Sequence, residues 1–481
     1  MSTNIRHIGL IGLGPHARRI YYPLLEKYSA LQQIRLVVVV DMEGNEDSVN
    51  AFLKSRTIQP LHIFFVAQDF AQSDTLDQKV IHFFNSLIEQ YKLDGIIISS
   101  EPKSHKGYLK WALQKDIDIL VDKPITCPIN AANTIKDAHQ IELDFCELKE
   151  LYMPARSNFI VQAQRRVHLG YSYIKKYLNE FINEFQVPIS YIDISHSDGM
   201  WVMPDEWERE NHSYKYGTGK LMHSGYHFVD LLAWFLKLNQ AVEEHEPDEI
   251  DMFVKSFNPL DFMNQLQSRH YDKFFHQNYS EQFLDDRLKQ LKNYGELDVF
   301  VLSQVKQCAS VVTTASLSLQ QNSFSRRSWS DQPLDIYKGN GRIRHERVNI
   351  QVSTLLNIQV HSYQSYQLSD KLVMDYSPGH IDHFDILIFR NSALTGGKAF
   401  ERLEFGKIFS EKTNVSDTYF SHNESARETL FVDFINRSRS ESDFLCHAFT
   451  NQLMSKIYEC IALERQGNIP YLVLTKEQLY I

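Results

Sequence analysis

The sequence predicts an α/β N-terminal domain built on a parallel sheet, followed by an α+β C-terminal domain with a large, mostly antiparallel, open-faced sheet. Strand-like and helix-like segments alternate through residues 1–165, as is typical of a parallel sheet covered by helices. In residues 166–481, apolar and polar side chains alternate along several strand-like segments, which is typical of an antiparallel sheet with one face on a core. A chain of 481 residues is long enough for both domains.

A glycine-rich turn follows the first apolar run of the chain. Residues 8–11 lead directly into GLGPHA, which has the spacing G-x-G-x-x-A and precedes a segment of helical periodicity. In a dinucleotide-binding turn the first glycine permits the bend, the second lets the backbone approach a pyrophosphate, and the small third residue allows close helix–strand packing. An ordinary strand-to-helix turn can have the same spacing, so the motif needs support from elsewhere. The residues expected at the cofactor are Gly12, Gly14, Pro15, His16 and Ala17.

That support comes from an acidic residue at the end of the second predicted strand. Asp41 follows the valine-rich run at residues 34–40. A carboxylate there accepts the ribose hydroxyls of NAD and repels the 2′-phosphate of NADP. The segment DMEGNED contains no arginine that would bind such a phosphate, so NAD is expected in preference to NADP. The alternative is an aspartate that only caps a turn.

The other segments of the N-terminal domain follow in alternating order. Apolar runs that end in polar turns predict strands at residues 61–68, 93–102, 117–126 and 157–166. Segments of helical periodicity predict helices at residues 79–91, 104–116 and 129–145.

The C-terminal domain is expected to begin with a helix at residues 171–185. Its predicted strands lie at residues 189–199, 248–257, 296–305, 308–319, 342–352 and 356–364. A charged helical insertion is expected near residues 260–295, and YKGNGRI predicts a hairpin turn at residues 337–343. The predicted closing elements are a helix at residues 449–467 and a strand at residues 469–474.

Composition excludes several classes of partner. The formal net charge of −10 argues against nucleic acid as a partner, and no apolar run approaches the roughly 20 residues that span a membrane. The five cysteines form no CxxC pair, which favours reduced thiols. Because MSTNIRH leads straight into a strand, no signal peptide is expected, and the predicted location is the cytoplasm.

Three motifs of the N-terminal domain resemble those of the Gfo/Idh/MocA oxidoreductases, a family named for glucose-fructose oxidoreductase and inositol dehydrogenase. GLGPHA is the first. SSEPKSH resembles the family's strand end T-P-P-x-x-H, and VDKPIT resembles its E-K-P signature with Asp in place of Glu. The matching residues are Ser100, Pro102, His105, Asp122, Lys123 and Pro124.

A fourth motif, within residues 207–235, resembles the family segment G-G-G-x-L-x-D-x-G-x-H-x-x-D. The matching residues are Gly217, Gly219, Leu221, Gly225, His227 and Asp230. His223 stands where the family usually has Asp, a difference that bears on the mechanism and the substrate class and not on the fold. On a regular helix from Leu221, His223, His227 and Asp230 share one face, and the opposite face should be core.

The resemblance covers nearly the whole chain and implies an NAD(P)-binding Rossmann domain and a substrate domain. It implies hydride transfer between NAD and a hydroxyl-bearing carbon of a sugar, cyclitol or related polyol. Lys123, near a peptide bond that is often strained or cis, and His227 are the expected catalytic residues. The expected substrate contacts are His223, Arg166 and Asp230, and the further cofactor contacts are Ser100, Pro102, His105, Asp122 and Lys123. The family commonly covers its open sheet with another subunit, so a homodimer or homotetramer is expected.

Several alternatives stay open. One branch of the family consists of glycosidases that retain NAD, and a non-catalytic sensor of dinucleotide or sugar is a different class. His223 and His227 can share a zinc ion, but HSGYH lacks the glutamate of a zinc-protease helix, and no metal is expected. Arg165 or Arg166 can form an interdomain ion pair instead of binding substrate. Tyr171, Trp201 and Trp207 can line a sugar-binding cleft. The alternative is a structural role, since aromatic residues of a folded domain are more often part of its core.

Overall fold

The computed structural model describes residues 5–67, 74–199, 204–210, 212–243, 245–275, 278–324, 343–365, 383–404 and 422–480. The chain forms two compact units, and each draws on separate stretches of sequence. The first unit comprises Met1–Pro128, Ile141–Leu169 and Phe420–Asn451, and the second comprises Ile129–Gln140, Gly170–Tyr419 and Gln452–Ile481. A single domain boundary between residues 165 and 166 stays a prediction.

The first unit is built on a six-stranded parallel sheet with the order β3-β2-β1-β4-β5-β6. Its strands are β1 Arg6–Ile11, β2 Ile34–Met42, β3 His62–Val66, β4 Gly95–Ile98, β5 Asp118–Val121 and β6 Phe159–Val161. The helices that contribute to this unit are α1 Pro15–Arg19, α2 Tyr21–Ala30, α3 Glu46–Lys54, α4 Gln78–Tyr91, α5 His105–Gln114, α6 Ile135–Tyr152 and α14 His422–Asn436. This strand order, which reverses direction between β1 and β4, confirms the predicted Rossmann fold.

Successive residues of the central strands alternate between two apolar cores, one on each face of this sheet. Ile96 and Ile98 pack in one core with Phe84 of α4 and Trp111 of α5. Ile97 packs in the other, whose members include Leu25 of α2 and Leu430 of α14. Both faces are buried, which explains why the strands are continuous apolar runs.

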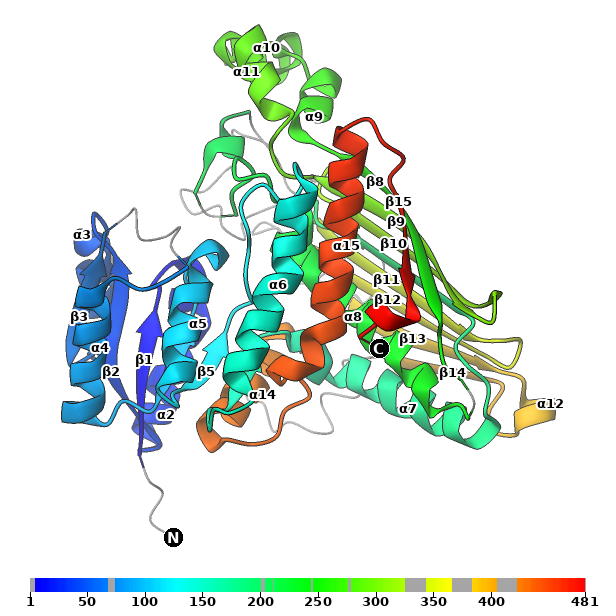
Figure 1. Cartoon of the computed structure of the whole chain (residues 1–481), viewed down its shortest axis with the longest axis horizontal. Coiled ribbons are helices and arrows are strands. Elements are labelled where there is room, and N and C mark those ends of the chain that lie inside the picture. Colours follow the sequence, from blue (N-terminus) through cyan, green and yellow to red (C-terminus); the bar gives the residue numbers. More distant parts are fainter. Residues whose placement is uncertain are drawn as a thin grey trace. The chain divides into compact units, whose positions relative to one another are not determined.

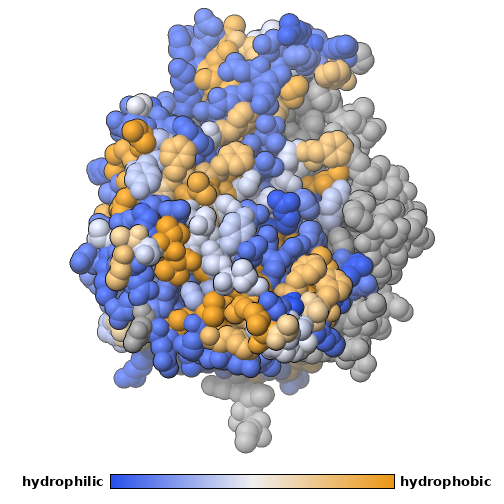
Figure 2. Space-filling view, turned by 90° about the vertical axis from the view of Figure 1, so that its right-hand side faces the viewer, coloured by the Kyte–Doolittle hydropathy of each residue, from blue (hydrophilic) through white to orange (hydrophobic). Residues whose placement is uncertain are grey.

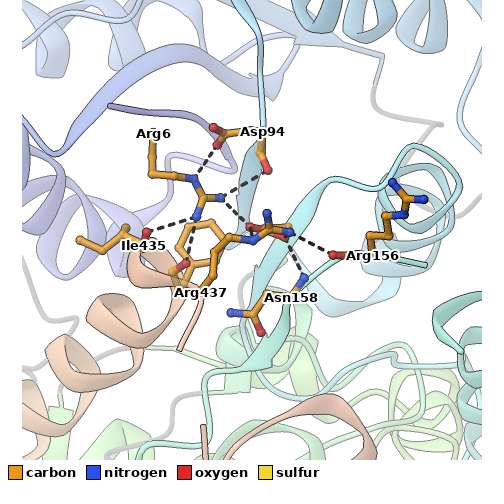
Figure 3. Close-up of polar contacts among 8 residues, drawn as sticks. Arg6, Asp94, Arg156, Asn158, Ile435 and Arg437 are labelled. Carbon is orange, nitrogen blue, oxygen red and sulfur yellow. Dashed lines mark hydrogen bonds and ion pairs between the residues drawn. The ribbon is translucent and has the colours of Figure 1, made fainter. Parts of the chain in front are cut away.

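Helix α14 was not predicted, and a buried ion-pair network holds the chain at its end (Figure 3). Asp118, only 1% exposed, accepts hydrogen bonds from Arg6 Nη2 at 2.7 Å and Arg437 Nη2 at 2.9 Å. Arg6 also pairs with Asp94 at 2.9 Å. Burial raises the pKa of Asp118, while its hydrogen bonds and the arginines act in the opposite direction. The network joins two segments more than 300 residues apart, so local periodicity cannot reveal it.

The second unit is built on a nine-stranded sheet with the order β14-β13-β12-β11-β7-β10-β9-β8-β15 (Figure 1). Strands β7 and β10 pair in parallel, and the other pairs are antiparallel, as the fold class predicted. Its strands are β7 Tyr191–Ser197, β8 Glu249–Phe257, β9 Asp298–Gln307, β10 Ser310–Gln320, β11 Ile343–Val352, β12 Leu356–Ser365, β13 His383–Arg390, β14 Phe400–Glu404 and β15 Tyr471–Thr475.

Helices α7 and α8 of the second unit lie on one face of this sheet (Figure 1). The helices that contribute to the unit are α7 Leu169–Phe185, α8 Tyr226–Leu236, α9 Pro259–Gln265, α10 Ser268–Phe275, α11 Asp285–Leu291, α12 Ser392–Thr395 and α15 Ala448–Arg465. Helices α9 to α11 lie in the range where the sequence predicts a charged helical insertion. Among the described residues, no helix combines the length and apolarity needed to cross a bilayer.

Three other local expectations have different outcomes. The helix predicted from residue 129 begins at Ile135, because the Asn130 and Ala132 N–H groups donate to Tyr216 O and Gly217 O at 2.8 and 3.0 Å. Strands β13 and β14 were missed. The hairpin turn predicted at residues 337–343 lies outside the described residues, apart from the first residue of β11.

Candidate functional site

The turn after β1 combines a close backbone approach with an open space. Gly12 has φ +87°, and a Cβ there would lie 2.6 Å from Ser100 N, so only glycine fits. A Cβ on Gly14 would meet no atom within 4 Å. The turn between β1 and α1 therefore packs against the end of β4 and leaves room above Gly14. This arrangement fits a dinucleotide whose pyrophosphate lies against the backbone at Gly14.

The two glycines should respond differently to substitution by alanine. We expect Gly12→Ala to lower the free energy of unfolding by about 1–3 kcal/mol, because a non-glycine residue is strained at this φ and its Cβ meets backbone. Gly14→Ala should change it by less than about 0.5 kcal/mol yet weaken NADH binding, because its Cβ occupies the open space. Urea unfolding and NADH titration measure both effects. Undiminished NADH affinity in Gly14→Ala would place the pyrophosphate elsewhere.

Asp41, at the end of β2, holds the same turn from the other side. Its Oδ2 accepts the Leu13 N–H at 2.8 Å. Its Oδ1 accepts the Met42 N–H at 2.8 Å and the Asn45 side-chain amide at 2.7 Å. The carboxylate therefore fixes the turn and the segment after β2 together, at the edge where a ribose is expected.

Arg18 of α1 is a residue of this edge that sequence reasoning missed. Its Nε donates to Leu13 O at 2.8 Å and its Nη2 donates to Ser48 Oγ at 3.0 Å. Burial lowers the pKa of Arg18, and the negative charge of Asp41 raises it. The segment DMEGNED after β2 contains no arginine, but helix α1 places Arg18 beside this segment, within hydrogen-bond distance of Ser48.

A hydrogen-bonded network joins the ends of β4 and β5 to the first helices. Asp122, directly after β5, accepts from Tyr21 Oη at 2.5 Å and from Ser99 Oγ at 2.6 Å. His16 Nε2 lies 3.6 Å from the same carboxylate. The peptide bond after Asp122 leads to Lys123, and the Lys123–Pro124 bond is cis.

His105, at the start of α5, connects two of these loops. It is fully buried, with Nε2 3.0 Å from Ser100 O and Nδ1 3.1 Å from Pro124 O. Burial lowers the pKa of His105, while the hydrogen bonds to the carbonyls of Ser100 and Pro124 act in the opposite direction. Pro102 opens the short 3₁₀ helix Pro102–Ser104 before it. The structure thus gathers the predicted cofactor residues of the first unit at the carboxyl ends of β1, β2, β4 and β5, the topological switch point.

Arg166 lies in the 3₁₀ helix Gln164–Val167 and is 2% exposed. Its guanidinium donates to Glu441 O and Cys446 O, both at 3.1 Å. These bonds anchor it to main-chain carbonyls of the same unit, and its role at a substrate stays a prediction.

In the second unit, the helix that carries the two predicted histidines begins with a wider turn than expected. Leu221–Gly225 is π-helical, and α8 continues from Tyr226. The first turn therefore differs from the regular helix that was expected. The face predicted to be core is buried, with Phe228, Leu231 and Phe235 inaccessible, and so are the other residues of α8. Such π-helical turns occur frequently at functional sites. His227 is 6% exposed and Asp230 is fully buried.

His223 lies in this π-helical turn, half-buried among aromatic rings. Its ring meets those of His212 and Tyr214 edge to face, at centroid distances of 4.9 and 5.1 Å. Among the other predicted aromatics, Trp207 and Tyr171 are buried in the core, and Trp201 lies outside the described residues. His223 is thus more accessible than His227.

Buried polar groups fix the start of this helix, and sequence reasoning missed them. Lys220, fully buried, places Nζ 3.1 Å from His196 Nδ1 and 3.7 Å from Asp198 Oδ2. The His196 ring stacks on Phe228 of α8 at 4.2 Å. The strand pattern held a signal, because His196 and Asp198 continue the buried parity of Ile192.

Glu296, two residues before the start of β9, supports the same π-helical turn. It is fully buried, and its Oε1 accepts the Leu221 N–H and the Tyr458 hydroxyl, both at 2.9 Å. Burial raises its pKa. Within the described residues, no group of three or more His, Cys, Asp or Glu side chains is arranged to hold a metal ion.

Comparison with known proteins supports the reading of the first unit. Residues 6–142 match the oxidoreductase family with an NAD-binding Rossmann fold. For this region, the match confirms the predicted family resemblance and the predicted NAD-binding Rossmann fold. No curated protein sequence matches the chain.

Solved structures share the fold over nearly the whole chain. Levoglucosan dehydrogenase, in complex with NADH and levoglucosan, is 11% identical with a TM-score of 0.58, over 99% of this chain and 100% of that one. Aldose-aldose oxidoreductase from Caulobacter crescentus, complexed with glycerol, is 11% identical with a TM-score of 0.54, over 98% and 100%. Scyllo-inositol dehydrogenase from Lactobacillus casei is 12% identical with a TM-score of 0.50, over 99% and 100%.

Proposed function

Since residues 6–142 match the Gfo/Idh/MocA oxidoreductase family, we propose that this chain is an NAD(H)-dependent dehydrogenase of a sugar, cyclitol or related polyol. The observation that carries the proposal is the cofactor cradle at the switch point, where the space above Gly14 and the carboxylate of Asp41 lie on one edge of the sheet. NAD, when bound, accepts hydride from the carbon that bears the reacting hydroxyl.

The chain's own residues then have to bind the substrate and move one proton. His227 takes the proton of the reacting hydroxyl, since an imidazole changes its charge within the physiological range. Lys123 hydrogen-bonds the same hydroxyl and helps to transfer its proton. His223, Asp230 and Arg166 orient the substrate. The buried contacts of Lys220 and Glu296 hold the turn that carries His223 in place.

The substrate class is supported by the names of structural neighbours, which act on levoglucosan, aldoses and scyllo-inositol. A screen of free sugars, nucleotide sugars and cyclitols, followed by the absorbance of reduced nicotinamide, tests it. We expect at least one compound to reduce NAD. Bound NAD without reduction by any compound would contradict a dehydrogenase.

A second candidate is a non-catalytic sensor of dinucleotide or sugar, favoured by His223 in place of the usual aspartate. It predicts ligand binding without turnover. A glycosidase of the same family differs from both, because it keeps NAD through purification and cleaves a glycoside without net change in NAD. Glycoside substrates in the same screen separate the three.

We also propose that the open face of the nine-stranded sheet is covered by a second copy of the chain. Figure 2 shows hydrophobic patches among hydrophilic residues on the side where this sheet lies. Tyr471, Phe253 and Leu302 are paired across β15, β8 and β9, so they form an apolar row. Their exposed fractions are 44%, 39% and 55%. A contiguous exposed apolar row is typical of an interface.

The unmodified protein should therefore be a homodimer or homotetramer by light scattering at micromolar concentration. Leu302→Asp should shift it towards monomer, because a carboxylate in the row would be desolvated on association. Leu143→Asp on α6 is the matched control, since Leu143 is 57% exposed and lies in the first unit. A monomeric unmodified protein would exclude the interface.

A further inference from the structure

The connection between β8 and β9 is far longer than the pairing of these two strands requires. Phe257, the last residue of β8, lies opposite Asp298, the first residue of β9, in an antiparallel ladder. Two residues are enough to join neighbouring strands of this kind. Here the connection contains α9, α10 and α11 (the α9–α11 segment, residues 258–275 and 278–297), which Figure 1 shows gathered at one end of the sheet. Since the sheet does not need this segment, its contacts indicate what it does.

The first contact is an apolar core that the α9–α11 segment shares with the loop before the π-helical turn. This flanking loop comprises residues 207–210 and 212–216. The buried members of the shared core include Trp207 and Tyr214 of the loop, Phe262 and Met263 of α9, and Leu291 of α11. The Trp207 ring meets Phe262 at a centroid distance of 5.6 Å and Tyr214 at 5.4 Å, both edge to face. Because such a core is close-packed, the loop cannot move away from α9 without opening a cavity.

Glu208 of the flanking loop is bound to the other end of the segment. Its carboxylate accepts hydrogen bonds from the Arg287 guanidinium of α11 and from the Tyr294 hydroxyl. Burial and the hydrogen bond to Glu208 raise the pKa of Tyr294 to about 12, so the hydroxyl stays a donor at neutral pH. The Gly295 N–H donates to Tyr214 O at 2.7 Å. These polar contacts fix the loop in addition to the apolar core.

The segment ends against the main chain that leads into the π-helical turn. A Cβ on Gly295 would lie 1.9 Å from Thr218 O, and a Cβ on Gly219 would lie 2.1 Å from Glu296 O. The Lys220 N–H donates to the same Glu296 O at 2.8 Å. Because the two main chains touch without space for a side chain, a shift of the segment is passed directly to the start of the π-helical turn.

The flanking loop in turn meets His223 itself, because the Tyr214 and His212 rings lie edge to face against the imidazole. We propose that the α9–α11 segment is a specificity element of the substrate site, and that Phe262 and Trp207 are positioning residues that hold the His223 ring in the orientation that binds substrate. The inference rests on the proposed function, in which His223 orients the substrate. The orientation of the ring can nevertheless be tested without turnover.

The first test measures the accessibility of His223 in the full chain. Diethyl pyrocarbonate acylates accessible imidazoles, and peptide mass spectrometry gives the rate at His223 separately. Phe262→Ala should raise this rate by about three- to tenfold, because the cavity that it leaves frees Trp207 and the loop that packs on the imidazole. Phe262→Leu refills most of the core and should restore most of the protection. Phe274→Ala is the matched control, since Phe274 of α10 is 60% exposed, and it should leave the rate unchanged.

The second test is kinetic and uses a substrate that the unmodified protein oxidises. Phe262→Ala should raise KM by about tenfold, which corresponds to the loss of one substrate hydrogen bond. It should leave kcat and the Kd for NADH within about threefold, because a contact made equally in the ground and transition states affects KM alone. A loss of NADH affinity as large as the rise in KM, or a fall in kcat at constant KM, would overturn the inference, since either indicates general destabilisation.

Arg287→Gln tests the same path without opening the core, and it keeps the test decisive if Phe262→Ala does not fold. Removal of the ion pair with Glu208 should raise the acylation rate and KM together, by about two- to fivefold. Lys289→Gln is its matched control, because Lys289 of the same helix is exposed and pairs with Asp286 at 3.2 Å. It should change neither quantity.

The two proposals can fail separately. If no compound is oxidised, the proposed function fails, while the acylation rate at His223 still decides whether the α9–α11 segment positions the ring. If a substrate is oxidised and both Phe262→Ala and Arg287→Gln match their controls in acylation rate and KM, the inference is overturned and the proposed function stands.

Discussion

His227→Ala should lower turnover by about 10²- to 10⁴-fold, the usual contribution of a positioned acid–base group. Cofactor affinity should barely change, because the turn and carboxylate expected to hold the dinucleotide belong to the first unit. Stopped-flow or steady-state assays give the turnover, and NADH titration gives the affinity. The measurement requires a substrate that supports turnover in the unmodified protein.

Because His227 is 6% exposed, its removal can also lower stability, so the variant's thermal midpoint should be recorded. His227→Gln is a second variant that fills more of the space and cannot act as a base at neutral pH. Both should be slow if His227 is the base. Full turnover in either folded variant would show that His227 is not the base. If the unmodified protein contained zinc and either variant lost it, a metal site at His227 would replace the proposed acid–base role.

His223→Asp provides the complementary variant. It restores the residue that the family usually has and should keep the fold, because His223 is half-buried beside His212 and Tyr214. Activity on the native substrate should change, since an anion replaces a neutral contact. Unchanged kinetics would show that this position does not meet the substrate.

The cofactor half of the site could be predicted from the sequence because its determinants are local. A turn that needs glycine at φ +87° leaves its mark within six residues, and the strand before Asp41 is a single apolar run. Arg18 could not be assigned in this way. Its partner Ser48 is 30 residues further along the chain, and only the packing of α1 near α3 brings them together.

In the second unit, the sequence predicts the sheet but not the buried contacts of the candidate site. Its sheet follows from alternation, but the contact of Lys220 with His196 does not, because an interior lysine contradicts the ordinary preference for exposure. The alternation of β7 does place His196 on the buried side of the strand with Ile192 and Ile194, provided that a polar residue is accepted at a buried position. Helix α14 could not be predicted for another reason, since it packs in the core of the first unit although more than 250 residues separate it from the preceding segment of that unit.

The last expected result concerns Lys123. Lys123→Ala should lower turnover by about 10²- to 10⁴-fold, because the same hydroxyl proton then lacks its second partner. The loop that carries Lys123 is held by Asp122, whose carboxylate is bonded to Tyr21 and Ser99. The variant should therefore keep its fold, with some loss of NADH affinity from poorer nicotinamide positioning.

Lys115→Ala is the matched control, since Lys115 is an exposed lysine of the same unit at the end of α5. It should leave turnover unchanged. Tyr21→Phe removes one hydrogen bond to Asp122 and should lower turnover less than Lys123→Ala does, because Ser99 still holds the carboxylate. If Lys123→Ala turns over as fast as Lys115→Ala, then Lys123 has no part in the proton transfer, and the loop after β5 serves the cofactor alone.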